Sequence, residues 1–245
     1  MMYQSVFQRY EIKYILTWEQ ARIIKEAISS RMTIDEYGPT TIRNIYFDTD
    51  DMRIIKTSLD QPDYKEKLRI RSYRSAGHDD PVFVELKKKY MGVVYKRRTE
   101  VISDLAMDWL AAGGDAPQYS QIAREITYFR DFYGCPVPKV FLSYLREAYV
   151  PRSGSDDLRI TFDTEILGRE TDLSFANGIY GRRILPEDKV LMEIKIPGVM
   201  PLWLSRLLSN LTIRKQSFSK YGAYYREYMQ DPAGTDETFR VKFAV

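Results

Sequence analysis

Charged side chains occupy every second position in several short segments of this 245-residue chain. In the segment 65–74, Lys67, Arg69 and Arg71 alternate with the apolar Leu68 and Ile70. Because successive side chains of a β-strand point to opposite faces, this alternation predicts strands with one charged and one apolar face. Similar sets recur along the chain: Arg9, Glu11 and Lys13; Glu85, Lys87 and Lys89; Lys96, Arg98 and Glu100; Tyr144 and Arg146; Arg159, Thr161, Asp163 and Glu165; Glu193 and Lys195.

The order of predicted elements indicates an α+β protein. Strands are predicted at 7–16, 40–48, 65–74, 81–89, 93–102, 139–150, 157–166 and 188–196. Their short spacing favours antiparallel pairing between neighbours. Thr17 and Gln20 form a capping-box pattern that begins a helix, and further helices are predicted at 104–112, 119–132, 201–208 and after Ser219. The sequence contains no linker or repeat, so we expect a single domain over 1–230 and a tail or edge strand over 231–245.

The direction of the charged faces is the open question at this point. An ordinary antiparallel sheet turns its apolar face to the core and its charged face to water. However, Lys67, Arg69 and Arg71 place three cations on one face of one strand, about 7 Å apart. In a confined space such a cluster is unfavourable unless an anion occupies it. Arg provides bidentate contacts to phosphate and Lys provides point charge, so a polyanionic phosphate compound fits this face.

The acidic residues on the same faces have two possible roles. Glu11, Glu85 and Glu193 each lie two residues from a lysine, namely Lys13, Lys87 and Lys195. The carboxylates could hold these lysines by ion pairing. They could also bind Mg²⁺ or Mn²⁺, which prefer carboxylates together with the oxygens of substrate phosphates. For Glu11 and Glu85 both roles stay open.

Composition excludes several classes of chemistry. The chain has one histidine, His78, in a turn-like run, and one cysteine, Cys135, so His/Cys zinc sites and internal disulfides are not expected. It contains no phosphate-binding glycine motif. The net charge of +3 is small for a protein that coats nucleic acid, so a nucleic-acid partner is not expected. Without a secretory signal or a long apolar run, we expect a cytoplasmic protein with no membrane segment.

Nine segments, in order, resemble the VTC domain, the polyphosphate-polymerase domain of the vacuolar transporter chaperone. This family belongs to the triphosphate tunnel metalloenzymes. The matching segments are Arg9-Tyr10-Glu11-Ile12-Lys13-Tyr14, Ile45-Tyr46-Phe47-Asp48-Thr49, Leu68-Arg69-Ile70-Arg71, Phe83-Val84-Glu85-Leu86-Lys87, Lys96-Arg97-Arg98, Tyr144-Leu145-Arg146, Arg159-Ile160-Thr161-Phe162-Asp163, Leu191-Met192-Glu193-Ile194-Lys195 and Phe218-Ser219-Lys220-Tyr221. The resemblance implies an antiparallel β-barrel tunnel with helices packed outside and a C-terminal helix.

The resemblance also implies roles for individual residues. It assigns catalysis to four cations: Lys220, Arg69, Arg71 and Arg146. It assigns substrate binding to Lys13, Lys87, Lys89, Lys96, Arg98, Arg159, Lys195 and Ser219. It favours Glu193 as the residue that carries Mn²⁺ or Mg²⁺, with Glu11 and Glu85 as further metal candidates. Ser219 and Lys220 come at the start of the last predicted helix, where backbone donors attract anions.

Two positions depart from the family pattern. Ser217 fills a position before Ser-Lys-Tyr that is usually basic, and Lys89 stands where the eukaryotic enzymes carry a histidine. Both lie near the implied chemistry. The regulatory and membrane segments of the eukaryotic proteins have no counterpart here, so a vacuolar location is not implied.

The implied activity is a polyphosphate polymerase that uses ATP or another triphosphate and a divalent metal. The acceptor would be the anionic end of a polyphosphate chain, which needs no general base. The same site with water as acceptor would be a triphosphatase or polyphosphatase. Two further alternatives stay open: a non-catalytic binder of polyphosphate or nucleic acid that stacks bases on Tyr46, Tyr73, Tyr90 and Tyr95, and a structural domain without activity.

Overall fold

The computed structural model describes residues 6–153 and 157–230. The strands are β1 (Val6–Thr17), β2 (Met32–Ile34), β3 (Thr40–Asp48), β4 (Tyr64–Ser72), β5 (Pro81–Tyr90), β6 (Val93–Ile102), β7 (Val137–Pro151), β8 (Arg159–Arg169), β9 (Arg182–Arg183) and β10 (Lys189–Ile196). The helices are α1 (Trp18–Ile28), α2 (Arg53–Leu59), α3 (Ser103–Ala111), α4 (Gln121–Phe132), α5 (Leu202–Asn210) and α6 (Lys220–Tyr224), which continues as a π-helical turn, η1 (Tyr225–Met229). The predicted tail, 231–245, lies outside the described residues.

The strands form one antiparallel sheet that curves into a β-barrel tunnel. Its order is β2-β7-β3-β4-β5-β6-β1-β10-β8-β9, with an additional pairing between β7 and β8. Because β7 pairs with both β3 and β8, the ladder of pairings returns on itself around eight strands. The short strands β2 and β9 extend this ring at β7 and β8. The predicted α+β class and tunnel architecture are therefore confirmed.

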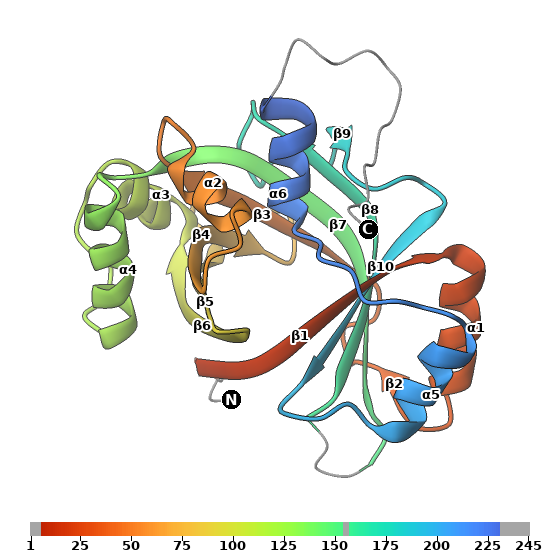
Figure 1. Cartoon of the computed structure of the whole chain (residues 1–245). Coiled ribbons are helices and arrows are strands. Elements are labelled where there is room, and N and C mark those ends of the chain that lie inside the picture. Colours follow the sequence, from red (N-terminus) through yellow and green to blue (C-terminus); the bar gives the residue numbers. More distant parts are fainter. Residues whose placement is uncertain (1–5, 154–156, 231–245) are drawn as a thin grey trace.

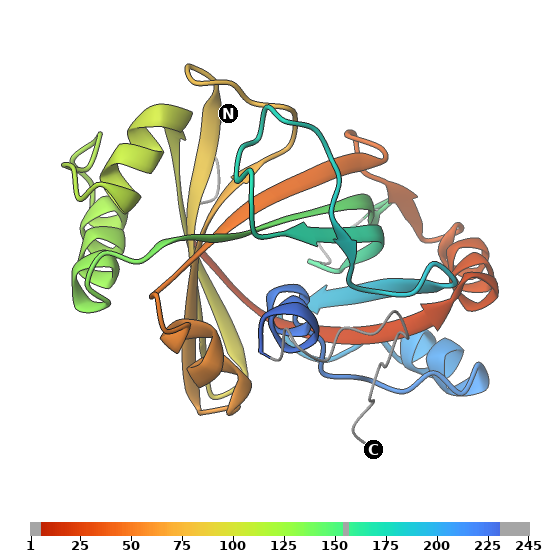
Figure 2. The ribbon, with the colours of Figure 1, turned by 90° about the horizontal axis from the view of Figure 1, so that it is seen from above.

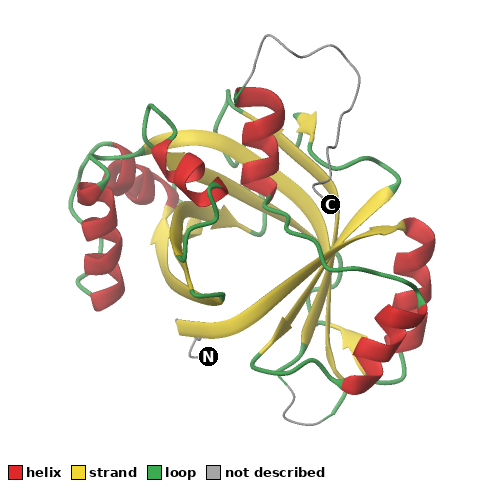
Figure 3. Cartoon of the chain, viewed as in Figure 1, coloured by secondary structure: helices red, strands yellow, loops and turns green. Residues whose placement is uncertain are grey.

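The helices lie outside the strands. Figure 1 shows α3 and α4 on one side of the molecule, α1 and α5 on the other, and α2 and α6 between them. The view from above gives the same arrangement, with helices at the periphery of the curved sheet (Figure 2). Figure 3, coloured by secondary structure, shows strands running through the middle of the molecule. In the described part of the chain, none of these helices is long and apolar enough to cross a membrane.

The apolar faces of the strands point outward, under the helices. Leu68 and Ile70 of β4 and Val84 of β5 belong to a buried cluster with Trp109 of α3 and Ile126 of α4. Each such fully buried aliphatic side chain contributes about 1.5–3 kcal/mol to folding. Two further clusters lie under α1 and α5 and under α2 and α6. Because the helices cover the apolar face, the charged face that alternates with it lines the barrel interior.

Local signals explain where the helices begin. The predicted capping box is confirmed, since Thr17 Oγ1 accepts from Gln20 N at 3.1 Å and Gln20 Oε1 accepts from Thr17 N at 3.0 Å. Helix α2 was not predicted. Its start is held by the buried carboxylate of Asp48, which accepts from the backbone N–H groups of Ile54 and Ile55. This carboxylate comes from the end of β3, so no standard capping pattern in the sequence marks it.

Candidate functional site

Strand register brings the charged residues of neighbouring strands to the same levels of the barrel. Lys67 of β4 pairs with Lys87 of β5, which in turn pairs with Lys96 of β6. On the opposite wall, Lys13 of β1 pairs with Glu193 of β10. Paired residues project from the same side of the sheet. The interior is therefore lined by charged side chains from strands far apart in sequence.

One group of these side chains surrounds Glu85, and we call it the Glu85 cluster. The carboxylate is fully buried and lies 2.7 Å from Arg69 Nη2. Burial alone would raise its pKa, yet Arg71 and Arg69 hold the pKa of the Glu85 carboxyl well below its usual range. The nitrogen-to-carboxylate distances to Glu85 are 2.7 Å for Arg69, 3.7 Å for Arg71, 3.4 Å for Lys96 and 3.9 Å for Arg98.

Neutral side chains fix the two arginines of β4 in this cluster. Arg69 Nη1 donates to Tyr46 Oη at 2.7 Å. Arg71 donates from Nε to Asn44 Oδ1 at 2.9 Å and from Nη2 to Tyr144 Oη at 3.1 Å. Both guanidinium groups are thus held at defined positions before any ligand binds, which favours recognition of a rigid anion such as phosphate.

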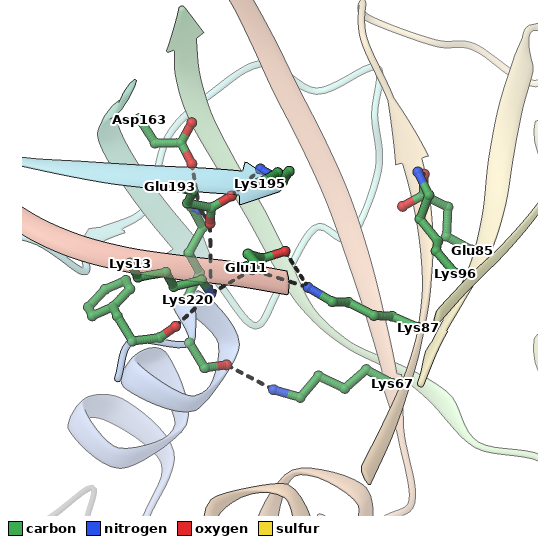
Figure 4. Close-up of polar contacts among 12 residues, drawn as sticks. Glu11, Lys13, Lys67, Glu85, Lys87, Lys96, Asp163, Glu193, Lys195 and Lys220 are labelled. Carbon is green, nitrogen blue, oxygen red and sulfur yellow. Dashed lines mark hydrogen bonds and ion pairs between the residues drawn. The ribbon is translucent and has the colours of Figure 1, made fainter. Parts of the chain in front are cut away.

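A second group, the Glu193 cluster, contains more carboxylates. It consists of Glu11, Asp163 and Glu193 with Lys13, Arg146, Lys195 and Lys220. Arg146 makes two 2.6 Å contacts to Asp163 and approaches Glu193 at 3.2 Å. Lys220 Nζ lies 2.6 Å from Asp163 Oδ2 and 3.2 Å from Glu193 Oε1. Figure 4 shows the members of this cluster other than Arg146 across the interior from Glu85 and Lys96.

Lysines link Glu11 to the rest of the interior. Lys13 Nζ lies 3.2 Å from Glu11 and 3.7 Å from Glu193, so it bridges the two carboxylates. Lys87 reaches across the interior to Glu11 at 3.1 Å, as Figure 4 shows. Lys195 pairs with Glu193 at 2.9 Å. The ion pairs considered as one of two alternatives, Glu11 with Lys13 and Glu193 with Lys195, are thus observed.

The alternative pairing of Glu85 with Lys87 is wrong. Lys87 pairs with Glu11, and Glu85 pairs with Arg69 on the next strand. Lys87 extends across the interior to β1, and Arg69, which lies directly opposite Glu85 in register, pairs with Glu85 in its place.

The ionisation of the Glu193 cluster is fixed by its own contacts. Burial would raise the pKa of Glu193, but Lys195, Lys220 and Lys13 hold that pKa well below its usual range. Burial would lower the pKa of Lys220, but Asp163 and Glu193 raise it. Both members therefore stay charged at neutral pH, and the barrel interior carries permanent charges of both signs.

The segment that begins α6 lies against the interior. Lys13 Nζ donates to the carbonyl oxygen of Phe218 at 2.7 Å. Lys67 Nζ donates to Ser219 Oγ at 2.8 Å, and Ser219 Oγ also accepts from Gly222 N as the N-cap of α6. These contacts hold the segment beside Lys220, whose side chain enters the Glu193 cluster.

Not every predicted residue lies in one of the two clusters. Arg159 shares the inward side with Lys195 but pairs with Asp35 at 2.7 Å and is 39% exposed. Lys89 pairs in register with Lys65 at the end of β5, beyond Lys87. Ser217 is exposed outside the barrel, so the position without the usual basic residue faces solvent.

Three interior residues were not selected from the sequence as site residues. Asp163 and Lys67 belong to the alternating sets, and Tyr144 lies beside Arg146 in the matching segment. The alternation could have identified all three. The residues two positions from Asp163 are Thr161 and Glu165, and neither is basic. Its partners Arg146 and Lys220 are known only once the strands are paired.

The donors available for a metal ion are the carboxylates around Lys13. Among the described residues, no group of three or more His, Cys, Asp or Glu side chains forms a ready-made metal site. Thr161 faces Glu193 in register, and its hydroxyl oxygen is buried without a hydrogen-bond partner. Glu11 and Glu193 together with this hydroxyl offer hard oxygen donors, and Mg²⁺ is commonly held by one or two carboxylates and substrate phosphates. These residues fit such an ion.

The histidine lies outside the barrel interior. His78 Nδ1 contacts Asp104 at 2.8 Å, and its side chain is 87% exposed. Tyr46, one of the tyrosines considered for base stacking, is 7% exposed and stacks on Tyr221 at 4.9 Å between ring centroids. The exposed His78 therefore does not support histidine chemistry inside the barrel. The buried Tyr46 does not offer an open surface for base stacking.

A family model described as the VTC domain matches residues 8–228, almost the whole described chain. The chain belongs to the VTC domain family. The suspected resemblance is therefore confirmed, and the match includes both charged clusters of this VTC domain. No curated protein matches the chain significantly in sequence.

One solved structure supports the fold of the VTC domain, and a second is reported beside it. A Bacillus halodurans protein provisionally named an adenylate cyclase is similar at a TM-score of 0.55 and 15% sequence identity, with 88% of this chain and 96% of that chain covered. The PH1819 protein of Pyrococcus horikoshii has a TM-score of 0.48 and 16% identity, with 90% and 99% covered. At such identities the likeness concerns the fold alone, which is the triphosphate tunnel fold.

Proposed function

We propose that this VTC domain is a polyphosphate polymerase that acts inside its barrel. A terminal phosphate oxygen of a polyphosphate chain attacks the γ-phosphorus of ATP or another nucleoside triphosphate. The new P–O bond forms as the bond between the γ-phosphorus and its bridging oxygen to the β-phosphate breaks. The nucleoside diphosphate leaves, and the chain is longer by one phosphate.

The observation that carries this proposal is the cation-rich interior with preorganised arginines. Phosphoryl transfer depends mainly on positioning and on neutralising charge. Arg69 and Arg71 on one wall and Arg146 on the other present guanidinium groups that match phosphate oxygens. Lys220 and Lys13 add ammonium groups near the same carboxylates. Such fixed charges stabilise a transition state without rearrangement.

Glu193 and Glu11 are the residues that would hold Mg²⁺ or Mn²⁺, next to the Thr161 hydroxyl. A divalent ion supplies charge neutralisation on the phosphate oxygens and on the leaving group. Glu193 is suited to this role because two of its partners have a second carboxylate. Lys220 also contacts Asp163, and Lys13 also contacts Glu11. Those lysines keep a carboxylate partner when Glu193 turns to another ligand.

The carboxylates of the Glu193 cluster are poorly suited to activate water for hydrolysis. Hydrolysis needs a base to activate water, and an effective base has a pKa near neutral pH. Burial would raise the pKa values of Glu11 and Asp163, but Lys87 and Lys13 lower the first and Arg146 and Lys220 lower the second. These carboxylates are weak bases. A chain terminus is already anionic and needs no base.

The test is incubation of the purified protein with ATP and Mn²⁺, followed by a gel for polyphosphate and an assay for free phosphate. We expect long chains from the wild type. The variant Lys220→Met should be about 100-fold slower, because one positioned electrostatic donor is typically worth that much. The matched control is Arg22→Ala, which removes a cation from the exposed face of α1 and should leave the rate unchanged.

Three results would count against this function. Free phosphate without chains would identify a hydrolase in the same barrel. No turnover by the wild type would remove the catalytic proposal. Turnover that is equal in Lys220→Met and wild type, with both folded by thermal unfolding, would place the chemistry elsewhere.

A further inference from the structure

A serine and a lysine form a close pair at the edge of the barrel interior. Lys67 comes from β4, and Ser219 precedes α6, 152 residues later in the chain. The Nζ–Oγ distance is 2.8 Å, and the Oγ is also held by the backbone N–H of Gly222 at 3.2 Å. Figure 4 shows Lys67 extending across the interior toward the segment that carries Lys220.

Lys67 differs from the other interior lysines in its surroundings. Among the described residues, no carboxylate lies within ion-pair distance of Lys67. Burial first, and then the positive charges of Lys13 and Lys87, lower the pKa of Lys67 to about 7. Its own strand adds two more cations with the same effect, Lys65 and Arg69. A fraction of Lys67 is therefore neutral near pH 7 and able to accept a proton.

We propose that Ser219 is a phosphoryl acceptor and that Lys67 is its general base. The proposal rests on the proposed function to the extent that a nucleoside triphosphate occupies the barrel. Ser219 Oγ attacks the γ-phosphorus, and its proton passes to Lys67 Nζ. The Oγ–P bond forms as the bond from the γ-phosphorus to the bridging oxygen breaks. The products are phosphoserine and a nucleoside diphosphate.

The product is stabilised where it forms. A phosphoserine carries close to two negative charges and three acceptor oxygens at neutral pH. Lys67 is now protonated and lies 2.8 Å from Ser219 Oγ, so a cation lies next to the new phosphate. The phosphoserine also presents a terminal phosphate oxygen to the next triphosphate. Ser219 thus provides a covalent starting point for a chain when no free polyphosphate is present.

The experiment uses the full chain with ATP and Mn²⁺ in the absence of added polyphosphate, and reads intact mass and the peptide that contains Ser219. We expect one or more phosphoryl groups on Ser219. Ser219→Asn keeps an oxygen that can cap α6 but has no hydroxyl nucleophile. Incubation with ATP and Mn²⁺ should therefore not increase the mass of this variant. The matched control, Ser217→Ala, removes an exposed hydroxyl two residues away and should be labelled like the wild type.

A second variant tests the lysine separately from folding and binding. Lys67→Arg keeps the positive charge and a hydrogen-bond donor but cannot accept the proton. We expect its labelling rate to fall about 100-fold, the usual contribution of a general base. Its affinity for tripolyphosphate, measured by calorimetry, should stay within a few-fold of wild type. That readout separates loss of the base from loss of the site.

The outcomes distinguish this inference from the proposed function. Polyphosphate synthesis without phosphate on Ser219 overturns the inference and leaves the polymerase intact. Phosphate on Ser219 without free or attached chains supports the inference and contradicts the polymerase. Equal labelling of Lys67→Arg and wild type overturns the role of Lys67, and an unmodified Ser219 in the wild type overturns the proposal as a whole.

Discussion

The Glu193 cluster and the Glu85 cluster share one barrel interior but compensate their cations differently. In the Glu193 cluster, Arg146 and Lys220 each contact both Asp163 and Glu193. In the Glu85 cluster, the described ion pairs of Arg69 and Arg71 go to Glu85 alone. Removing one carboxylate from the first cluster leaves most cations paired. Removing Glu85 leaves buried guanidinium groups with no carboxylate.

This difference assigns different tasks to two residues that look alike in the sequence. Lys13 and Lys220 would each keep a carboxylate partner, Glu11 or Asp163, if Glu193 turned to a metal ion. Glu85 is needed to hold Arg69 and Arg71 in place, so we propose a positioning role for it in preference to metal binding. An anionic phosphate then complements the excess positive charge on the Glu85 side.

The largest expected effect is on stability. Glu85→Gln removes the carboxylate from a fully buried cluster of cations, and breaking such a pair costs about 3–5 kcal/mol. The free energy of unfolding, measured in urea, should fall by about this amount. Tripolyphosphate should restore more stability to Glu85→Gln than it adds to the wild type. Glu19→Gln, which removes an exposed partner of Arg22, should show no measurable change.

An unchanged stability of Glu85→Gln would show that the arginines do not depend on Glu85. The two clusters would then be equivalent, and the preference for Glu193 over Glu85 as a metal ligand would lose its basis.

The next effect is on metal dependence. Glu193→Gln should lower the Mn²⁺-dependent rate about 100-fold, equivalent to about 2.7 kcal/mol, and should raise the Mn²⁺ concentration needed for half-maximal rate. Its urea stability should change less than that of Glu85→Gln. In Glu85→Gln, the half-maximal Mn²⁺ concentration should stay near that of wild type. If Glu85→Gln raised the half-maximal Mn²⁺ concentration and Glu193→Gln lost more stability, Glu85 would be the metal ligand and Glu193 the positioning residue.

A further effect concerns Lys67, which belongs to neither cluster. Its pKa of about 7 in the fold lies below the ordinary value of 10.5. Between pH 7 and 10 the unfolded chain therefore binds a proton that the folded chain lacks, and stability rises with pH in this interval. Urea unfolding should show this rise in the wild type and a weaker rise in Lys67→Met.

Tripolyphosphate should remove the difference between the two proteins, because a bound anion favours charged Lys67. Parallel pH profiles of wild type and Lys67→Met without ligand would contradict the lowered pKa.

Much of the fold could be predicted from the sequence, because alternation has a direct structural meaning. The alternation in β4 predicted a strand with one cationic face, formed by Lys67, Arg69 and Arg71. It also predicted an apolar face, formed by Leu68 and Ile70, and α3 and α4 cover that face. The short β2 and β9 and helix α2 were not predicted. They depend on contacts with distant strands, as the Asp48 cap of α2 illustrates.

The pairing inside the site was less predictable. One of the two roles considered for each carboxylate was an ion pair with the lysine two residues away. This pair is observed for Glu11 and Glu193 and not for Glu85. The partners of Asp163 are Arg146 and Lys220, the latter 57 residues away. Such partners follow from strand register and from where α6 begins, which no local pattern encodes.

The most direct test of a phosphate-binding interior is calorimetric titration with tripolyphosphate and with a single-stranded oligonucleotide at the same salt concentration. Tripolyphosphate should bind the wild type and Arg22→Ala clearly more tightly than the oligonucleotide does. Arg71→Ala should bind it about 10- to 100-fold more weakly, since a hydrogen bond to a charged group contributes about 1.5–3 kcal/mol. Equal affinity of Arg71→Ala and wild type, or equal affinity for the two ligands, would contradict a phosphate site inside the barrel.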